Sequence, residues 1–221
     1  MCGRFALYSD PRVLRDRFDL VEVVEYRPSY NIAPSEFTPI AAVTQNKDGR
    51  HLSLYRWGLV PTWVKELPKH LFINARAETI DQKPSFKGPF KYHRCLIPAD
   101  GYYEWQKVGK AKQPWYIHAS DGQPLAFAGL FDVWLAPTGD ELHSATIITT
   151  DAGARTKHIH DRMPVVLRPE DWNAWLSGTT PKEDLLGLLR PTAEGLLDCH
   201  RVSMTVNKAE YDEPSCIEVI G

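Results

Sequence analysis

The stretch from Cys95 to Thr150 contains four strand-like segments with no helical segment between them. The segments at 95–107, 114–120, 124–135 and 144–150 are rich in β-branched and aromatic residues, which fit a pleated sheet. The first of them bends at an Asp100–Gly101 pair, so it predicts two short strands. Strands that follow one another through short turns usually pair antiparallel. This stretch therefore predicts antiparallel sheet.

The rest of the chain adds strands and a few short helices around that sheet. Residues 38–45 and 51–60 predict two strands joined by the turn NKDGR, and 164–167 and 199–206 predict two more. Residues 10–20 predict an amphipathic helix with Asp10 as N-cap and Pro11 in its first turn. Two further helices are expected at 169–178 and 181–189.

Strands and helices do not alternate, and no glycine-rich phosphate loop is present. A nucleotide-cofactor enzyme is therefore not expected, and we predict no cofactor. The pattern favours an α+β fold, mainly antiparallel β sheet curled into an incomplete barrel and flanked by a few helices. At 221 residues without linkers or repeats, residues 1–221 predict a single domain.

The lack of a recognisable targeting signal and the pattern of cysteines predict an intracellular protein. No apolar run approaches the roughly 20 residues of a membrane span, and the first residues do not resemble a signal peptide. The four cysteines form no CxxC pair, which argues against a zinc module and a disulfide scaffold. We expect a reduced cytoplasmic monomer without a membrane partner.

The charge is unevenly distributed, although the net charge is only −2. Residues 61–112 carry 10 Lys/Arg and 5 Asp/Glu, whereas residues 113–221 carry 8 and 16. A polyanion such as DNA could bind the basic middle of the chain. A solvated lysine surface would have the same composition, and charge alone favours that simpler interpretation.

The chain begins MCGRF, which places a cysteine directly after the initiator methionine. Once Met1 is removed, Cys2 carries an α-amine and a thiol on adjacent carbons. Such a 1,2-aminothiol condenses with an aldehyde: the amine forms an imine, and the thiol closes a five-membered thiazolidine ring. A cysteine can also occur at position 2 by chance, so this motif depends on the rest of the chain.

Two other segments supply residues suited to proton transfer. In DGYYEW (100–105), Glu104 lies among aromatic residues, and burial there would raise its pKa toward neutrality. In HIHDRMP (158–164), His160 lies in a predicted loop, where histidines are often functional. The simpler alternatives are that Glu104 faces solvent on its strand and that His160 only forms a structural hydrogen bond in its loop. His158 and His160 have the spacing of metal ligands, but only Cys2 could be a third ligand, so no metal is predicted.

The segment NARAET (74–79) combines an amide with a guanidinium. Asn74 can hold an amine or hydroxyl, and Arg76 offers a planar fork that matches phosphate. The alternatives are a helix cap at Asn74 and a surface ion pair between Arg76 and Glu78.

Six motifs in order resemble those of one family. They are MCGRF, YNIAPSE (30–36), RWGLVPTW (56–63), INARAET (73–79), IPADGYYEW (97–105) and HDRMP (160–164). Together they resemble the SRAP family, the SOS response-associated peptidases or abasic site processing proteins, in their bacterial type. The resemblance extends from residue 2 to about residue 210.

The resemblance implies a DNA-damage enzyme with autopeptidase activity and an SRAP fold, associated with the nucleoid when it is bound to DNA. Such proteins recognise abasic sites in single-stranded DNA and crosslink to them as a thiazolidine through the N-terminal cysteine, which protects the lesion from cleavage and error-prone bypass. By resemblance Cys2 supplies both nucleophiles and Glu104 transfers protons. His160 would open the sugar ring, and Asn74 would hold the Cys2 amine and the sugar. Met1 would be removed by self-cleavage, although a methionine aminopeptidase could do the same.

The DNA-binding residues expected from the resemblance lie in several of these motifs. We choose Arg4, Arg76 and Arg162 for the flanking phosphates, Asn31 and Pro34 as groove lining, and Trp63 as a base-stacking side chain. Relatives often carry a second tryptophan directly after the first, where this chain has Val64.

Two other functions remain open. An N-terminal-cysteine amidohydrolase or peptidase acting on a small substrate would use the same Cys2 but predicts turnover. A non-catalytic module that binds single-stranded DNA would leave Cys2 incidental, so binding would survive Cys2→Ser unchanged.

Overall fold

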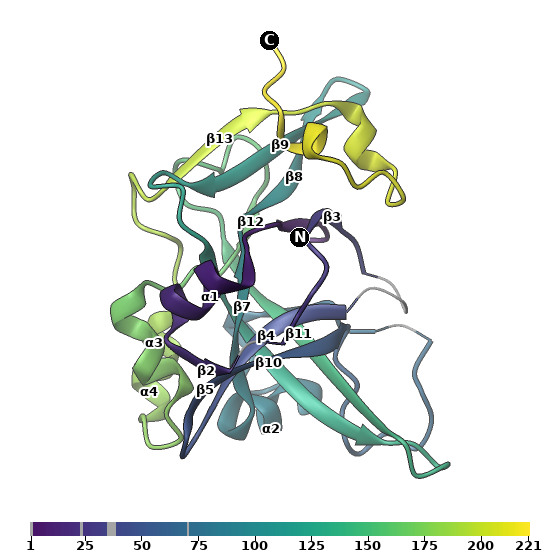
Figure 1. Ribbon diagram of the computed structural model, residues 1–221, viewed down its shortest axis with the longest axis vertical. Coiled ribbons are helices and arrows are strands. Elements are labelled where there is room, and N and C mark those ends of the chain that lie inside the picture. Colours follow the sequence, from purple (N-terminus) through teal and green to yellow (C-terminus); the bar gives the residue numbers. More distant parts are fainter. Residues whose placement is uncertain (1, 23, 35–38, 70) are drawn as a thin grey trace.

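The computed structural model describes residues 2–22, 24–34, 39–69 and 71–221 (Figure 1). The strands are β1 (Phe5–Leu7), β2 (Leu20–Glu22), β3 (Ser29–Ile32), β4 (Pro39–Asn46), β5 (Gly49–Trp57), β6 (Asn74–Arg76), β7 (Arg94–Ala99), β8 (Gly101–Val108), β9 (Ala111–Ala119), β10 (Leu125–Leu135), β11 (Glu141–Asp151), β12 (Arg162–Pro164) and β13 (Leu197–Arg201). The α-helices are α1 (Pro11–Phe18), α2 (Pro84–Tyr92), α3 (Pro169–Leu176) and α4 (Lys182–Leu188), and short 3-10 helices cover Ala77–Thr79, Met204–Asn207 and Pro214–Ile217.

The larger sheet forms a barrel. Strands β11, β10, β7, β4 and β5 pair antiparallel in that order. A short parallel pairing of β5 with β11, at Arg56–Ser144 and Trp57–Ala145, closes the ring. Strand β6 also pairs parallel with β11. The predicted α+β class, with mainly antiparallel sheet curled into an incomplete barrel, is confirmed. The pairing of β5 with β11, which completes the ring, is a feature that the sequence did not predict.

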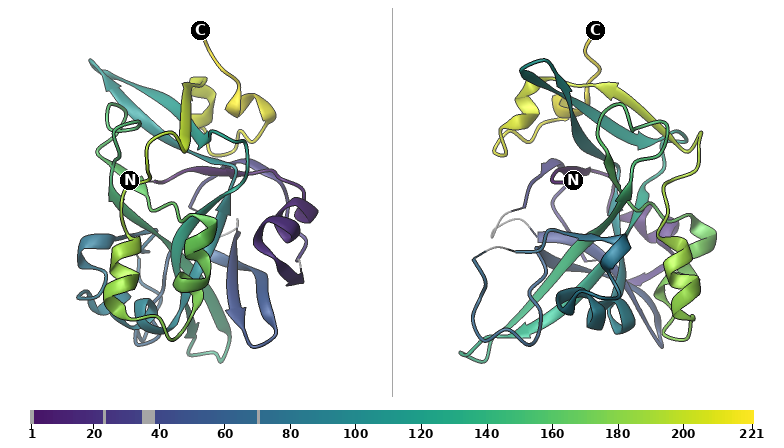
Figure 2. Two further views of the ribbon diagram at one scale, coloured as in Figure 1. Left: turned by 90° about the vertical axis from the view of Figure 1, so that its left-hand side faces the viewer. Right: turned by 180° about the vertical axis from the view of Figure 1, so that it is seen from behind.

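A second, antiparallel sheet packs against one end of the barrel and has the strand order β13-β9-β8-β1-β3 (Figure 2). Strand β7 of the barrel continues into β8 of this sheet with only Asp100 between them. The Asp100 carboxylate accepts hydrogen bonds from the backbone N–H groups of Tyr8 and Ser9, at 2.6 and 2.8 Å. The start of the chain is thereby attached to the junction of the two sheets.

Aromatic side chains join the two sheets in the core. Phe5 of β1 packs edge-on against Trp57 of β5 and Phe127 of β10, with ring centroids 5.1 and 6.2 Å apart. All three side chains are fully buried. Edge-to-face aromatic packing of this kind is stabilising beyond the area it buries. It holds the residues next to Cys2 at a set position relative to the barrel.

The predicted helix at 10–20 is confirmed as α1. The Asp10 carboxylate accepts the backbone N–H of Arg12 at 2.8 Å, which is an N-cap. Phe18, on the buried face of α1, stacks on Trp172 of α3 with centroids 4.7 Å apart. Helices α3 and α4 confirm the two later predictions. No helix in the described part of the chain is long and apolar enough to span a membrane.

Two predictions for shorter elements need correction. The strand expected at 164–167 is instead β12, Arg162–Pro164. After Pro164 the chain crosses from β11 to β10, because the Val165 N–H donates to the Ile148 carbonyl of β11 and the Leu167 N–H donates to the Ala126 carbonyl of β10. The strand expected at 199–206 ends at Arg201, and a 3-10 helix begins at Met204. Helix α2 was not predicted at all, because Gly88 and Pro89 lie in it.

Candidate active site at Cys2

Cys2 lies fully buried where the chain enters β1. The backbone that follows it runs antiparallel to β8, with Phe5 opposite Tyr102 and the Tyr103 N–H donating to the Arg4 carbonyl at 3.0 Å. This register places Cys2 beside the part of β8 that carries Glu104. The Cys2 thiol lies 3.9 Å from the Arg4 carbonyl oxygen.

Asn74 holds the backbone of Cys2. Its side chain projects from β6, which pairs with β11 at Ile147, and Nδ2 donates to the Cys2 carbonyl oxygen at 2.8 Å. The Asn74 Oδ1 atom is buried and accepts no hydrogen bond from the described residues. Asn74 therefore has an acceptor to spare beside Cys2, which an amine or a hydroxyl could use.

Glu104 is buried on β8, with 3% of its surface exposed. Burial raises the pKa of its carboxyl, because desolvation disfavours the charged form, and the nearby His160 opposes part of that shift. The His160 Nε2 atom lies 3.9 Å from Glu104 Oε2. A carboxyl whose pKa is moved toward neutrality can both donate and accept a proton in the same reaction.

His160 reaches this position from the loop between β11 and β12. The Gln106 side chain of β8 donates to the His158 carbonyl at 3.1 Å, which ties the loop to the strand that carries Glu104. The Arg162 backbone N–H donates to His160 Nδ1 at 2.9 Å. Asp161 Oδ1 lies equally close to Nδ1, but its side chain is 86% exposed and free to turn toward water. We therefore assign the Nδ1 atom as the acceptor of the Arg162 N–H, and the Nε2 atom faces Glu104.

The thiol of Cys2 is protonated at neutral pH. Burial raises its pKa above the ordinary range, and the charge of Glu104 raises it further. A nucleophilic thiolate therefore forms only if a neighbouring base takes the proton, and Glu104 is the carboxylate that acts on it.

The four residues predicted for the chemistry thus lie together: Cys2, Asn74, Glu104 and His160. A cavity of about 490 Å³ opens beside two of them. Its lining is Glu104, Trp105, Lys112, His160, Met204 and Asn207.

Several residues around the cavity were not predicted for this site. Trp105 Nε1 donates to Asn207 Oδ1 at 2.7 Å, which brings the 3-10 helix at 204–207 to the cavity. Trp115 stands opposite Glu104 in the β8–β9 pair, and its Nε1 donates to Gln106. The register of the β8–β9 hairpin could have predicted that Trp115 lies opposite Glu104. No local sequence pattern predicts that residues 204–207 lie against β8.

The predicted DNA-binding residues divide into two groups. Trp63, which is 63% exposed, and Arg76 present their side chains to solvent, and Pro34 is half-buried. The others have partners within the protein, as Arg4 donates to Asn31 Oδ1 and to the Val206 carbonyl, both at 2.7 Å.

Asn31 and Arg162 are also engaged. Asn31 is buried and donates to backbone carbonyls between Val206 and Tyr211. Arg162 forms ion pairs with Glu78 and Asp151 at 2.6 and 2.7 Å. In this arrangement Arg4 and Asn31 brace the C-terminal segment, and Arg162 braces the His160 loop. Their role in DNA binding stays a prediction.

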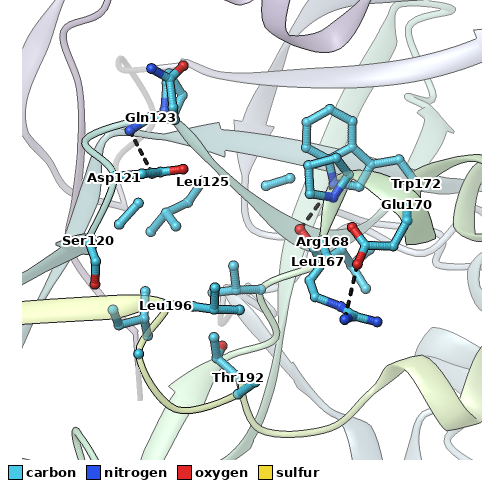
Figure 3. Close-up of a pocket in the computed structure, with 18 of the residues that line it drawn as sticks. Ser120, Asp121, Gln123, Leu125, Leu167, Arg168, Glu170, Trp172, Thr192 and Leu196 are labelled. Atoms are coloured by element: carbon cyan, nitrogen blue, oxygen red, sulfur yellow. Dashed lines mark hydrogen bonds and ion pairs between the residues drawn. The ribbon is translucent and has the colours of Figure 1, made fainter.

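A second cavity, of about 440 Å³, lies between the β9–β10 turn, the start of α3 and residues 192–197 (Figure 3). Among its charged lining residues, Arg168 forms an ion pair with Glu170 at 3.0 Å. It shares no lining residue with the cavity at Glu104. Among the described residues, no group of three or more His, Cys, Asp or Glu side chains could hold a metal ion.

Comparison with known proteins agrees with the six motifs. Residues 1–209 match the family described as SOS response associated peptidase (SRAP). The chain belongs to this family. The SRAP family assignment made from the motifs is therefore confirmed.

Relatives match this SRAP chain over nearly its whole length. The abasic site processing protein YoqW of Bacillus subtilis is 40% identical over 224 residues, which cover 99% of both chains. The abasic site processing protein HMCES of Gallus gallus is 35% identical over 98% of this chain and 77% of its own. A crystal structure of a protein from Bacteroides thetaiotaomicron superposes with a TM-score of 0.91 at 28% identity, covering 99% of this chain and all of the other.

Proposed function

We propose that this SRAP protein recognises abasic sites in single-stranded DNA and traps them as a thiazolidine through Cys2, once Met1 has been removed. The names of the relatives support the substrate, because they are abasic site processing proteins. The observation that carries the chemistry is the position of Cys2, held at its carbonyl by Asn74 and buried beside Glu104.

The proposed reaction conserves electrons and releases one water. An abasic deoxyribose is in equilibrium with its open-chain aldehyde. The neutral α-amine of Cys2 adds to the aldehyde carbon, and loss of water gives an imine. The Cys2 sulfur then bonds to the same carbon, and the thiol proton goes to the nitrogen. The product is a five-membered thiazolidine attached to the DNA.

Glu104 and His160 supply the proton transfers that these steps need. Glu104 protonates the departing water and recovers a proton from the nitrogen as the imine forms. It then gives that proton to the imine nitrogen while taking one from the buried thiol, a dual role that its raised pKa supports. His160 would protonate the ring oxygen of the sugar and open it to the aldehyde. The spare acceptor of Asn74 would hold the Cys2 amine or a sugar hydroxyl.

The α-amine of Cys2 becomes available only when the Met1–Cys2 bond is cleaved. We propose that the protein cleaves this bond itself, with Cys2, Glu104 and His160 as its catalytic residues. A methionine aminopeptidase would give the same product. The Glu104→Gln variant distinguishes the two routes. If the protein cleaves itself, the variant should keep Met1; if an aminopeptidase removes Met1, the variant should lack it.

The test is a denaturing gel of the protein with a single-stranded oligonucleotide that carries one abasic site. We expect a heat-stable shifted band for wild type, from protein whose mass lacks methionine, and none for Cys2→Ser or Cys2→Ala. Cys2→Ser should still bind the oligonucleotide in a native assay. No band from wild-type protein that starts at Cys2 would contradict the proposal.

The same experiment separates the two other functions. Repeated turnover of a small amide by wild-type protein, without a DNA adduct, would favour an amidohydrolase. Binding that is identical in wild type and Cys2→Ser, again without an adduct, would favour a DNA-binding module.

A further inference from the structure

The exposed side of α2 carries a row of lysines. Lys87 and Lys91 stand one turn apart on the helix, and Lys83 precedes them by another turn at the N-cap. All three side chains are exposed. Phe86 and Phe90 bury the neighbouring side of the helix, about 100° around the axis from Lys87 and Lys91, so these lysines point to solvent beside the contact with the barrel. We call these three residues the lysine row.

The positive charge of the lysine row is not neutralised locally. Residues 82–99 contain no Asp or Glu. The acidic residues just before them are already paired, Glu78 with Arg162 at 2.6 Å and Asp81 with Lys182 at 3.5 Å. Within the described parts of the chain, no ion pair involves the lysine row. The charges of these lysines repel one another, and binding of a polyanion would relieve that repulsion.

A short segment of the chain connects the site to the start of the row. Strand β6, which carries Asn74 and the exposed Arg76, passes through one 3-10 turn to the start of α2. Backbone hydrogen bonds from Gln82 and Lys83 to the Thr79 carbonyl, at 3.2 and 3.0 Å, fix that connection. Figure 1 shows α2 against the barrel end of the molecule.

An exposed aromatic ring ends the row. Tyr92 is 68% exposed, and Lys91 Nζ lies 4.8 Å from the centre of its ring. Proteins that bind single-stranded nucleic acid without reading its sequence combine cations that follow the backbone with aromatic rings that stack on bases. Lys83, Lys87, Lys91 and Tyr92 have this composition.

We propose that the lysine row and Tyr92 bind the DNA strand beyond the lesion, so that α2 extends the interface outward from Arg76. This inference rests on the proposed function and adds a second contact to it. Lys83 and Lys91 are eight positions apart, about 12 Å along a helix, which matches roughly three phosphates at the 3.4 Å spacing of a stacked strand. The contact raises affinity for long strands and takes no part in the chemistry at Cys2.

The experiment compares two oligonucleotides with a tetrahydrofuran abasic analogue, which lacks the aldehyde and cannot be crosslinked. One is about 6 nucleotides long, and the other extends it by about 10 nucleotides on each side. We expect Lys87→Gln/Lys91→Gln to weaken binding of the long strand about 10- to 25-fold at 0.1 M salt. The slope of log K against log salt should fall by about 1.4, and binding of the short strand should not change. Tyr92→Ala should weaken long-strand binding without changing the slope.

The control is Lys47→Gln/Arg190→Gln, which removes the same charge from exposed residues in the β4–β5 turn and after α4. Equal losses in both double variants would show a general charge effect and overturn the proposal. Wild-type protein that binds both strands equally would also overturn it. Crosslinking of the short strand with a true abasic site tests the proposed function separately, and both double variants should retain it.

Discussion

At the scale of single residues, Glu104 is placed where stability and chemistry oppose each other. Its side chain is buried next to His160, and burial raises the pKa of its carboxyl. A buried carboxylate is costly at neutral pH, where the unfolded chain would ionise it freely. The proposed exchange of protons between Glu104 and the Cys2 thiol depends on the same burial.

Glu104→Gln protein from which an aminopeptidase has removed Met1 should therefore crosslink about 10²- to 10⁴-fold more slowly than wild type and be more stable at neutral pH. A carboxyl whose pKa is higher in the folded than in the unfolded state stabilises the fold at low pH. This contribution is complete below the pKa of the unfolded chain, and it is lost as the pH rises through the pKa of the folded protein. Glutamine does not titrate, so the variant avoids that loss. The melting temperature of the variant should exceed that of wild type near pH 7, and the difference should shrink toward about pH 4.

The measurement is thermal unfolding of both proteins across that pH range. The two proteins share all other titratable groups, so the difference between their melting temperatures isolates the contribution of Glu104. A difference that does not change with pH would contradict a raised pKa of Glu104.

At the scale of elements, the segment between β5 and β6 holds Trp63 out toward solvent. Leu59 and Phe72 form an isolated bridge at its base. Trp134 Nε1 of β10 donates to the Val64 carbonyl at 2.7 Å, next to Trp63. These contacts fix the backbone beside the exposed ring, so stacking on a base would require little ordering of the loop.

Trp63→Ala should weaken binding of single-stranded DNA about 5- to 150-fold, from a stacking contribution of roughly 1–3 kcal/mol. Crosslinking at saturating DNA should keep its wild-type rate, because stacking by Trp63 contributes to binding and takes no part in the proposed proton transfers at Cys2. Titration of the rate against DNA concentration separates the two effects. A lower rate at saturation would show that Trp63 also positions the lesion.

At the scale of the whole molecule, the junction of β7 and β8 decides how the second sheet meets the barrel. Gly101 begins β8, and Tyr116 of β9 packs directly over it. A Cβ atom at Gly101 would lie 2.4 Å from Cζ of Tyr116, whose side chain is buried. Only glycine permits this close approach of the two strands. Glu104 lies three residues further along β8, so the same junction positions the site.

Gly101→Ala should lower stability by about 1–3 kcal/mol through overpacking and slow crosslinking. Each kcal/mol corresponds to about 2–4 °C in melting temperature for a chain of this size. Gly187→Ala in α4 is the matched control, because its added Cβ would meet no atom within 4 Å. Equal melting temperatures for the two variants would show that the junction can relax.

Local patterns in the sequence determined much of the fold and the reactive group. The Asp10 cap and Pro11 start α1, and the NKDGR turn joins β4 to β5, because capping and turn chemistry act within a few residues. The 1,2-aminothiol of Cys2 is likewise a property of one residue. Helix α2 escaped prediction because Gly88 and Pro89 disfavour a helix, while burial of Phe86 and Phe90 stabilises one.

Only the tertiary structure decided which groups meet and in what state. Asn74 reaches the Cys2 carbonyl across 72 residues of chain, because β6 and β1 both attach to the closed barrel and its neighbouring sheet. Arg162 was expected from the resemblance to contact a DNA phosphate, but folding brings Glu78 and Asp151 to it. The pKa values of Cys2 and Glu104 also depend on burial. Burial and long-range contacts are sums over the whole packed chain, so no short stretch of sequence contains them.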